Sequence, residues 1–261
     1  MQNASRPVAV AAIRGLFVVL LLALWSVGSA VYGDTVLPPP LSIAATVIHG
    51  WREGWLMHAT AVTISEVVPA FLIAAIVGTG FGLLLGLRDV WGDVLEPMIL
   101  GVYSIPKITL YPVFLVLFKL GMASKVAFGF FHGVFPVEIM TQRATSTVSP
   151  VYLKVARTMR LTPWQTTVHV LLPAILPALT VGLRLAFSLT FIGVTLAEMS
   201  ASRAGLGFLL NAADSTFDSQ RTLAVIVILA AIGIGTNALF YAVERRVSPA
   251  RAEVRQATLK M

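Results

Sequence analysis

Six long apolar stretches divide the chain, and each is long enough, or nearly so, to cross a lipid bilayer. They are Gly15–Val31, Val67–Leu87, Pro97–Phe118, Val126–Gln142, Leu176–Glu198 and Thr222–Val243. An α-helix rises about 1.5 Å per residue, so about 20 residues cross a hydrocarbon core of about 30 Å. The stretches lack the alternation of apolar and polar residues that marks a barrel strand. The pattern therefore predicts an all-α, polytopic membrane bundle of six transmembrane helices.

The first apolar stretch has two interpretations. Arg6 and Arg14 precede it, and Gly28-Ser29-Ala30 resembles the small-residue site at which a signal peptide is cleaved. However, the stretch is somewhat long for a signal peptide, and a chain with later spans needs a first anchor. We therefore expect an uncleaved helix.

Composition supports a membrane protein and excludes several other classes. Hydrophobic residues make up 57% of the chain and charged residues only 12%, and the mean hydropathy is +0.86. A water-soluble domain of this size could not bury so much apolar surface. The chain has no cysteine, which excludes disulfides, thiolate metal sites and a thiol nucleophile.

The basic residues predict how the chain is oriented. The net charge is +7, which in a soluble protein would suggest a nucleic-acid partner. Here the basic residues lie mostly between and after the apolar stretches, so no nucleic-acid partner is expected. One side of the predicted bundle holds 13 Lys and Arg residues, the other holds 5, and Lys107 lies inside a span. The excess places both termini and the 143–175 loop in the cytoplasm.

The 143–175 loop carries two helix-start signals. Ser149-Pro150 and Thr162-Pro163 each combine an N-cap residue with proline at the first helical position. They predict two short amphipathic helices outside the membrane, with an interruption at Pro173 and Pro177 before the fifth span. Such a hairpin can dock in a groove of a partner protein. Alternatively, it lies on the lipid surface with its basic residues facing headgroups.

Several motifs spread over nearly the whole chain carry a family resemblance. In the loop they are Lys154-Val155-Ala156, Arg160 and Leu172-Pro173. Elsewhere they are Ile105-Pro106-Lys107, Gly182-Leu183-Arg184-Leu185-Ala186, Ala197-Glu198-Met199 and Gly205-Leu206-Gly207. On these residues the chain resembles the permease subunits of bacterial ATP-binding-cassette (ABC) importers of the nitrate, sulfonate and taurine type. In two positions it departs from the family's pattern, because Lys154 replaces a glutamate and Arg160 replaces a glycine.

The resemblance implies the location, the partners and the coupling site. It places the chain in the bacterial inner membrane with a second permease subunit, two cytoplasmic ATP-binding subunits and an extracytoplasmic solute-binding protein. The solute would be a small anion such as a sulfonate, taurine or nitrate, and the two-helix loop would couple the permease to the ATP-binding subunit. The coupling residues would be Lys154, Val155, Ala156, Arg157, Thr158, Met159, Arg160 and Trp164.

Charged residues within the spans are candidates for the translocation path. Lys107, Glu138 and Glu198 lie inside or at the edges of spans, where an ionised group is costly unless it faces protein or water. Pro106 should bend the third helix beside Lys107. The lysine could then attract an anion, or it could form a structural pair with Glu66 or Glu138.

The remaining motifs limit the chemistry of the chain. Gly78, Gly82 and Gly86 recur on one face of the second span and favour close helix packing within the subunit over a dimer contact. The histidines lack a metal-binding spacing, and no phosphate-binding loop is present. We therefore expect no cofactor and no metal, and we expect ATP hydrolysis on a separate subunit.

We expect one permease domain over residues 1–261. Residues 1–57 form the first span and an extracytoplasmic loop, residues 58–243 form a five-helix core, and residues 244–261 form a cytoplasmic tail. Two other classes remain as alternatives. An ion-gradient-driven secondary carrier for a small organic anion would be expected to show internal repeats, which we do not see. An intramembrane enzyme would need converging catalytic groups.

Overall fold

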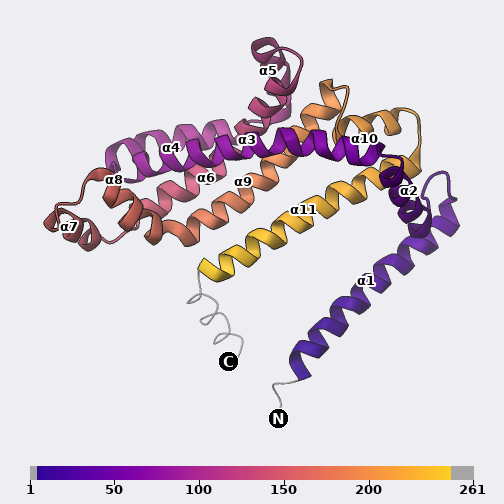
Figure 1. Cartoon of the computed structure of the whole chain (residues 1–261), viewed down its shortest axis with the longest axis horizontal. Helices are drawn as coiled ribbons and strands as arrows, with labels where there is room; N and C mark the ends of the chain where they lie inside the picture. The colour runs from indigo at the N-terminus through magenta and orange to yellow at the C-terminus, as the bar shows by residue number, and fades with distance from the viewer. Residues whose placement is uncertain (1–4, 248–261) are drawn as a thin grey trace.

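A computed structural model describes residues 5–247 of the chain, with the side chains of residues 12–88 and 90–246. All regular elements in this part are helical, which confirms the predicted all-α class (Figure 1). They are α1 (Ser5–Tyr32), α2 (Pro40–Arg52), α3 (Trp55–Gly86), α4 (Asp89–Ser104), η1 (Lys107–Leu110), α5 (Tyr111–Phe118), α6 (Met122–Ser146), α7 (Pro150–Thr158), α8 (Pro163–Thr166), η2 (Thr167–Leu171), α9 (Leu172–Ala201), α10 (Leu206–Ser215) and α11 (Ser219–Val247).

The number of helices that could span a membrane is lower than the six expected. Among the described residues, four segments are long and apolar enough, and a bent pair makes a fifth if it counts as one span. The helix left out is α6, which contains the expected fourth span. This helix carries Lys125, Glu138 and Arg143, and it packs between α3 and α9. A helix covered by neighbouring helices does not need a uniformly apolar surface, so its low hydropathy has a physical reason.

The glycine face of α3 lies against α6 inside the subunit, as predicted. A Cβ atom placed on Gly82 would lie 2.6 Å from the carbonyl oxygen of Glu138 and 2.6 Å from the Cβ of Thr141. Gly78 and Gly86 are equally close to α6 one turn away in each direction. The absence of side chains therefore lets the two backbones approach each other closely.

The third predicted span is broken rather than bent. Helix α4 ends at Ser104, and after Pro106 the chain continues as η1 and α5 in a direction that differs by 86°. Proline removes a backbone donor and clashes with the preceding turn, which explains the break at this position. In Figure 1, α5 projects away from the layer formed by the long helices.

The expected interruption before the fifth span is wrong. Segments α8, η2 and α9 form one continuous helical run from Pro163 to Ala201. Pro173 directly follows the π-helical turn η2, whose shifted hydrogen-bond register accommodates the missing N–H, and Pro177 lies inside α9 without ending it. The second of the two expected short helices is therefore the beginning of the fifth span.

The two ends of the bundle carry different short helices. Helices α3, α9 and α11 alternate in direction, so α7 lies at one end, and α2 and α10 lie at the other (Figure 1). We call these the α7 end and the α2 end. Helix α1 contacts mainly α2 and is otherwise exposed along its described side chains. The tail residues beyond Val247 lie outside the described part of the chain.

Candidate functional site

Both helix-start signals of the 143–175 loop act as predicted. The Ser149 side chain accepts a hydrogen bond from the Val151 amide (3.4 Å) at the start of α7. Thr162 and Gln165 form a reciprocal capping box, with bonds of 3.2 and 2.9 Å, at the start of α8. These caps satisfy backbone donors that a helix start leaves free, so local sequence alone defines where both helices begin. We call residues 149–171, which include α7, α8 and η2, the coupling segment.

Arg160 occupies a left-handed backbone conformation at the end of α7. Its φ angle is +53°, in the region that glycine adopts most readily. The Arg160 amide donates to Arg157 (2.9 Å), and the Leu161 amide donates to Ala156 (3.0 Å). This pair of bonds is a Schellman motif. The turn therefore keeps the backbone geometry that the family's glycine would permit, even though arginine stands in its place.

The coupling segment exposes an apolar face at the α7 end of the bundle. The exposed fractions of Val155, Met159 and Trp164 are 51%, 68% and 74%. The charged residues expected at the same contact, Lys154 and Arg157, are also exposed, and so is Thr158. Ala156 differs, because it is buried within the chain on the side where α7 packs against η2. Its side chain is covered within the chain itself, and its part in the coupling contact stays a prediction.

Lys107 lies at the break between α4 and α5. Its Nζ donates to the carbonyl oxygen of Tyr103 (3.0 Å) and lies 4.1 Å from the centre of the Tyr103 ring and 5.7 Å from that of Phe135. Among the described residues it forms no ion pair with Glu66, Glu138 or any other carboxylate. The alternative of a structural ion pair is therefore not what the structure contains.

Glu138 is buried on α6, and neither of its carboxylate oxygens has a hydrogen-bond partner among the described residues. The nearby Arg143 instead pairs with Glu96 of α4, with Nη2 2.9 Å from Oε1. A buried carboxylate without a hydrogen-bond partner is unusual and destabilises the fold, so such a residue is a candidate for a functional site. Its role in translocation stays a prediction.

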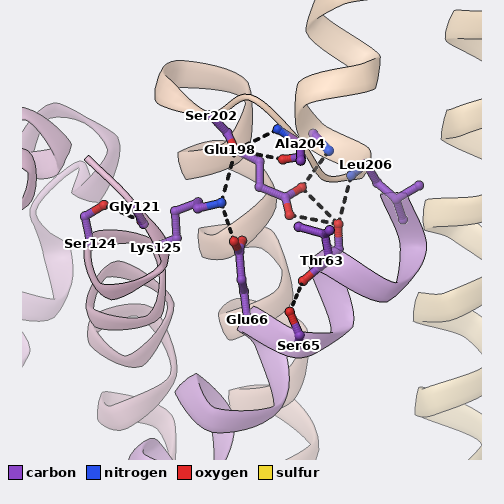
Figure 2. A network of polar contacts seen from close by, with 12 residues as sticks. Thr63, Ser65, Glu66, Gly121, Ser124, Lys125, Glu198, Ser202, Ala204 and Leu206 are labelled. Atoms are coloured by element: carbon purple, nitrogen blue, oxygen red, sulfur yellow. Dashed lines mark hydrogen bonds and ion pairs between the residues drawn. The ribbon is translucent and has the colours of Figure 1, made fainter. Parts of the chain in front are cut away.

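Glu198 is fully buried at the end of α9, where it holds the start of α10 (Figure 2). Its carboxylate accepts bonds from the Thr63 hydroxyl (2.8 and 3.0 Å) and from the Gly207 amide (2.7 Å). Thr63 in turn accepts a bond from the Leu206 amide (2.8 Å). A Cβ on Gly205 would collide with the carboxylate, and Gly205 has a φ of +107°, so only glycine fits there. This geometry is typical of a structural role for Glu198, and its role in the translocation path stays a prediction.

A second buried pair was missed by sequence reasoning. Lys125 of α6 pairs with Glu66 of α3 and donates to the Ser202 hydroxyl (3.0 Å), as Figure 2 shows. Lys125 stands one residue before the expected fourth span, Val126–Gln142, but it is buried in the first turn of α6. The sequence did contain one signal for this pair, because Lys125 and Glu66 each stand at the edge of a predicted span. Another pair between distant segments joins Arg184 of α9 and Glu244 of α11 (3.2 Å).

Three comparisons place these features in a family. Residues 40–249 match the model of the binding-protein-dependent transport system inner membrane component. The bicarbonate transport system permease of Synechococcus elongatus is 30% identical, over 82% of this chain and 81% of the relative. The aliphatic sulfonate transport permease of Bacillus subtilis is 28% identical, over 87% and 83%, and the taurine transport permease of Escherichia coli is 25% identical, over 92% and 90%.

Solved structures show the same fold. A chain of the methionine ABC transporter in an inward-facing conformation aligns with a TM-score of 0.66 at 16% identity, covering 75% of this chain and 97% of that one. The family match covers most of the chain and sets aside the secondary carrier and the intramembrane enzyme. The chain therefore belongs to the binding-protein-dependent transport system inner membrane component family, and it is a multi-pass inner-membrane permease subunit of an ABC importer that works with a separate ATPase and a binding protein.

Proposed function

We propose that two copies of this chain form the pathway of an importer for a small anion, with one ATP-binding subunit on each copy. Relatives are named for aliphatic sulfonates, nitrate and bicarbonate, which are all small oxyanions. A relative named for taurine adds a small molecule with a sulfonate group. These names support a small oxyanion as the substrate class. The whole chain acts as one permease domain in this proposal.

The α7 end faces the cytoplasm in this proposal. Basic side chains gather at this end, including Arg88, Arg143, Lys154, Arg157 and Arg245. Cytoplasmic segments of membrane proteins carry an excess of lysine and arginine. We therefore place the coupling segment and both termini in the cytoplasm and the α2 end outside. Helix α6 then crosses the membrane as a sixth span, shielded from lipid by α3 and α9.

The exposed apolar face of the coupling segment is the observation that carries the proposal. Val155, Met159 and Trp164 would be costly to leave in water, and they project from a segment whose own turn is stabilised by caps and a Schellman motif. A preformed segment loses little conformational entropy on docking. We infer that this face enters a groove of the ATP-binding subunit, while Lys154, Arg157 and Arg160 lie at the rim. A hairpin lying on lipid is the alternative.

Replacing Trp164 by alanine tests the contact. Buried aromatic anchors dominate interface energies, so Trp164→Ala should weaken binding of the ATP-binding subunit about tenfold or more. Phe217→Ala is a matched control, because Phe217 is also an exposed aromatic (89%) but lies at the α2 end, between α10 and α11. The measurement is co-purification of the ATP-binding subunit with each variant. Equal retention by Trp164→Ala and Phe217→Ala would favour the lipid-surface alternative.

Lys107, Glu138 and Glu198 remain the candidates for the translocation path. Lys107 is supported most directly, since its ammonium group lies at a helix break without a carboxylate partner among the described residues. Glu138 is supported by its unpaired buried carboxylate. Glu198 has the weakest support, because both of its carboxylate oxygens already accept hydrogen bonds from Thr63 or from the start of α10.

A further inference from the structure

A cleft opens at the α2 end of the bundle between α3, α6 and the loop that joins α9 to α10. Its volume is about 670 Å³, which falls within the usual range for small-molecule sites. The polar side chains that line it are Glu66, Lys125, Ser202 and Arg203, and apolar lining includes Val62 and Leu120. Figure 2 shows the buried floor of this region, where Lys125 points toward both Glu66 and Ser202.

The Lys125 ammonium group has one donor to spare. It carries three N–H donors, and two of them are used by Glu66 and by the Ser202 hydroxyl. Ser202 is itself held by Ala204, donating to its carbonyl oxygen (2.7 Å) and accepting from its amide (3.3 Å). The lysine is therefore fixed in place, and its third N–H has no partner among the described residues.

Arg203 provides a second cationic group at the rim. Its side chain is exposed, and within residues 5–247 it makes no hydrogen bond or ion pair. The charges of Glu66 and Lys125 offset each other, so Arg203 leaves the lining with a net charge of +1. A guanidinium group presents parallel donors that match two oxygens of a carboxylate, sulfonate or similar group.

We propose that this cleft binds a small water-soluble oxyanion at the extracytoplasmic mouth of the permease, through Arg203 and the free N–H of Lys125. The proposal rests on the proposed function, because it places the cleft where a solute leaves the binding protein. It adds a site on the permease itself, so selection of the solute does not rest on the binding protein alone. The apolar wall leaves room for a short alkyl group beside the oxyanion.

Binding can be measured on the complex of the permease with its ATP-binding subunit in nanodiscs of zwitterionic phosphatidylcholine, without the binding protein. Titration calorimetry with methanesulfonate should show binding, whereas dimethyl sulfone, which has a similar shape and no charge, should show none. Arg203→Gln should weaken methanesulfonate binding about tenfold, since it removes charge-assisted hydrogen bonds. Lys125 is left unchanged, because its removal would strand the buried Glu66.

Arg52→Gln is the matched control. Arg52 is an exposed arginine at the same end of the bundle, outside the cleft, and its replacement should leave the affinity unchanged. Equal affinities for the wild type and Arg203→Gln, or no binding at all, would overturn the proposal.

A second arm uses nanodiscs with anionic phosphatidylglycerol. If that lipid, and not methanesulfonate, binds in an Arg203-dependent way, the occupant is a headgroup and the proposal of a solute site is wrong.

The experiments distinguish an incorrect cleft site from an incorrect proposed function. ATP-dependent uptake tests the proposed function without reference to the cleft. It is measured in proteoliposomes made from the same purified complex, with the binding protein added. Uptake with no methanesulfonate binding would remove only the cleft site. Absence of both association with the ATP-binding subunit and uptake would remove the proposed function.

Discussion

The turn at Arg160 predicts that glycine stabilises the coupling segment at position 160 and destabilises it at position 157. Arg160→Gly should stabilise the coupling segment, because an L-residue in the left-handed conformation costs about 1–2 kcal/mol compared with the right-handed one, and glycine is nearly free of that cost. Glycine also gains about 0.4–1 kcal/mol of conformational freedom in the unfolded chain, which works against it. The net stabilisation is about 0.5–1 kcal/mol.

Arg157→Gly is the control within the same helix. Arg157 lies in the last turn of α7, where glycine is less favourable than arginine by about 0.7 kcal/mol. Both variants lose one exposed positive charge, so charge cannot explain a difference between them. The expected changes in local stability therefore have opposite signs.

Amide hydrogen exchange of residues 150–171 measures this local stability. Exchange through local opening reports its free energy, so Arg160→Gly should increase protection about two- to fivefold and Arg157→Gly should reduce it by about threefold. The most informative amide is that of Leu161, which closes the Schellman motif on Ala156. Reduced protection in Arg160→Gly, similar to that in Arg157→Gly, would refute the left-handed assignment and the account of the turn.

Three further predictions concern the pore, the orientation and the packing. Lys107→Met should reduce transport while leaving assembly and basal ATP hydrolysis intact, because the lysine has no carboxylate partner among the described residues; loss of assembly would contradict this. Because the chain has no cysteine, Thr162→Cys and Arg52→Cys can be labelled cleanly, and an impermeant thiol reagent added outside intact cells should react only with the latter. Gly82→Ala should destabilise the fold by about 1–3 kcal/mol, whereas Gly80→Ala, which meets nothing within 4 Å, should not; equal melting temperatures would rule out the close α3–α6 contact.

Local signals in the sequence predicted the parts of the structure that depend on neighbouring residues. The caps at Ser149 and Thr162 and the glycine face of α3 required only short-range patterns. The break after Ser104 was anticipated as a bend, because Pro106 indicates where a helix is interrupted but not through what angle. Pro173 and Pro177 were expected to interrupt the chain, but whether a proline ends a helix depends on whether the surrounding turns accommodate it, as η2 does before Pro173.

Contacts between distant segments could not be predicted in this way. The pairing of Lys125 with Glu66, and of Glu198 with Thr63 and the start of α10, joins residues that are far apart in the chain. Charged residues at span edges showed that partners were needed, but not which partners. Likewise, the apolar stretch Val126–Gln142 did not show that α6 lies between α3 and α9, because the hydropathy of one segment does not say which helices cover it.

In our proposal this permease works as part of an ATP-driven importer for a small anion. The most direct measurement is uptake of a labelled sulfonate, nitrate or bicarbonate into proteoliposomes that contain the permease and its ATP-binding subunit, with the binding protein supplied on the side of the α2 end. We expect uptake of at least one of these anions. This uptake should require ATP and all three components, and it should fall with Trp164→Ala. Uptake by the permease alone, driven by an ion gradient and insensitive to ATP, would contradict the proposal.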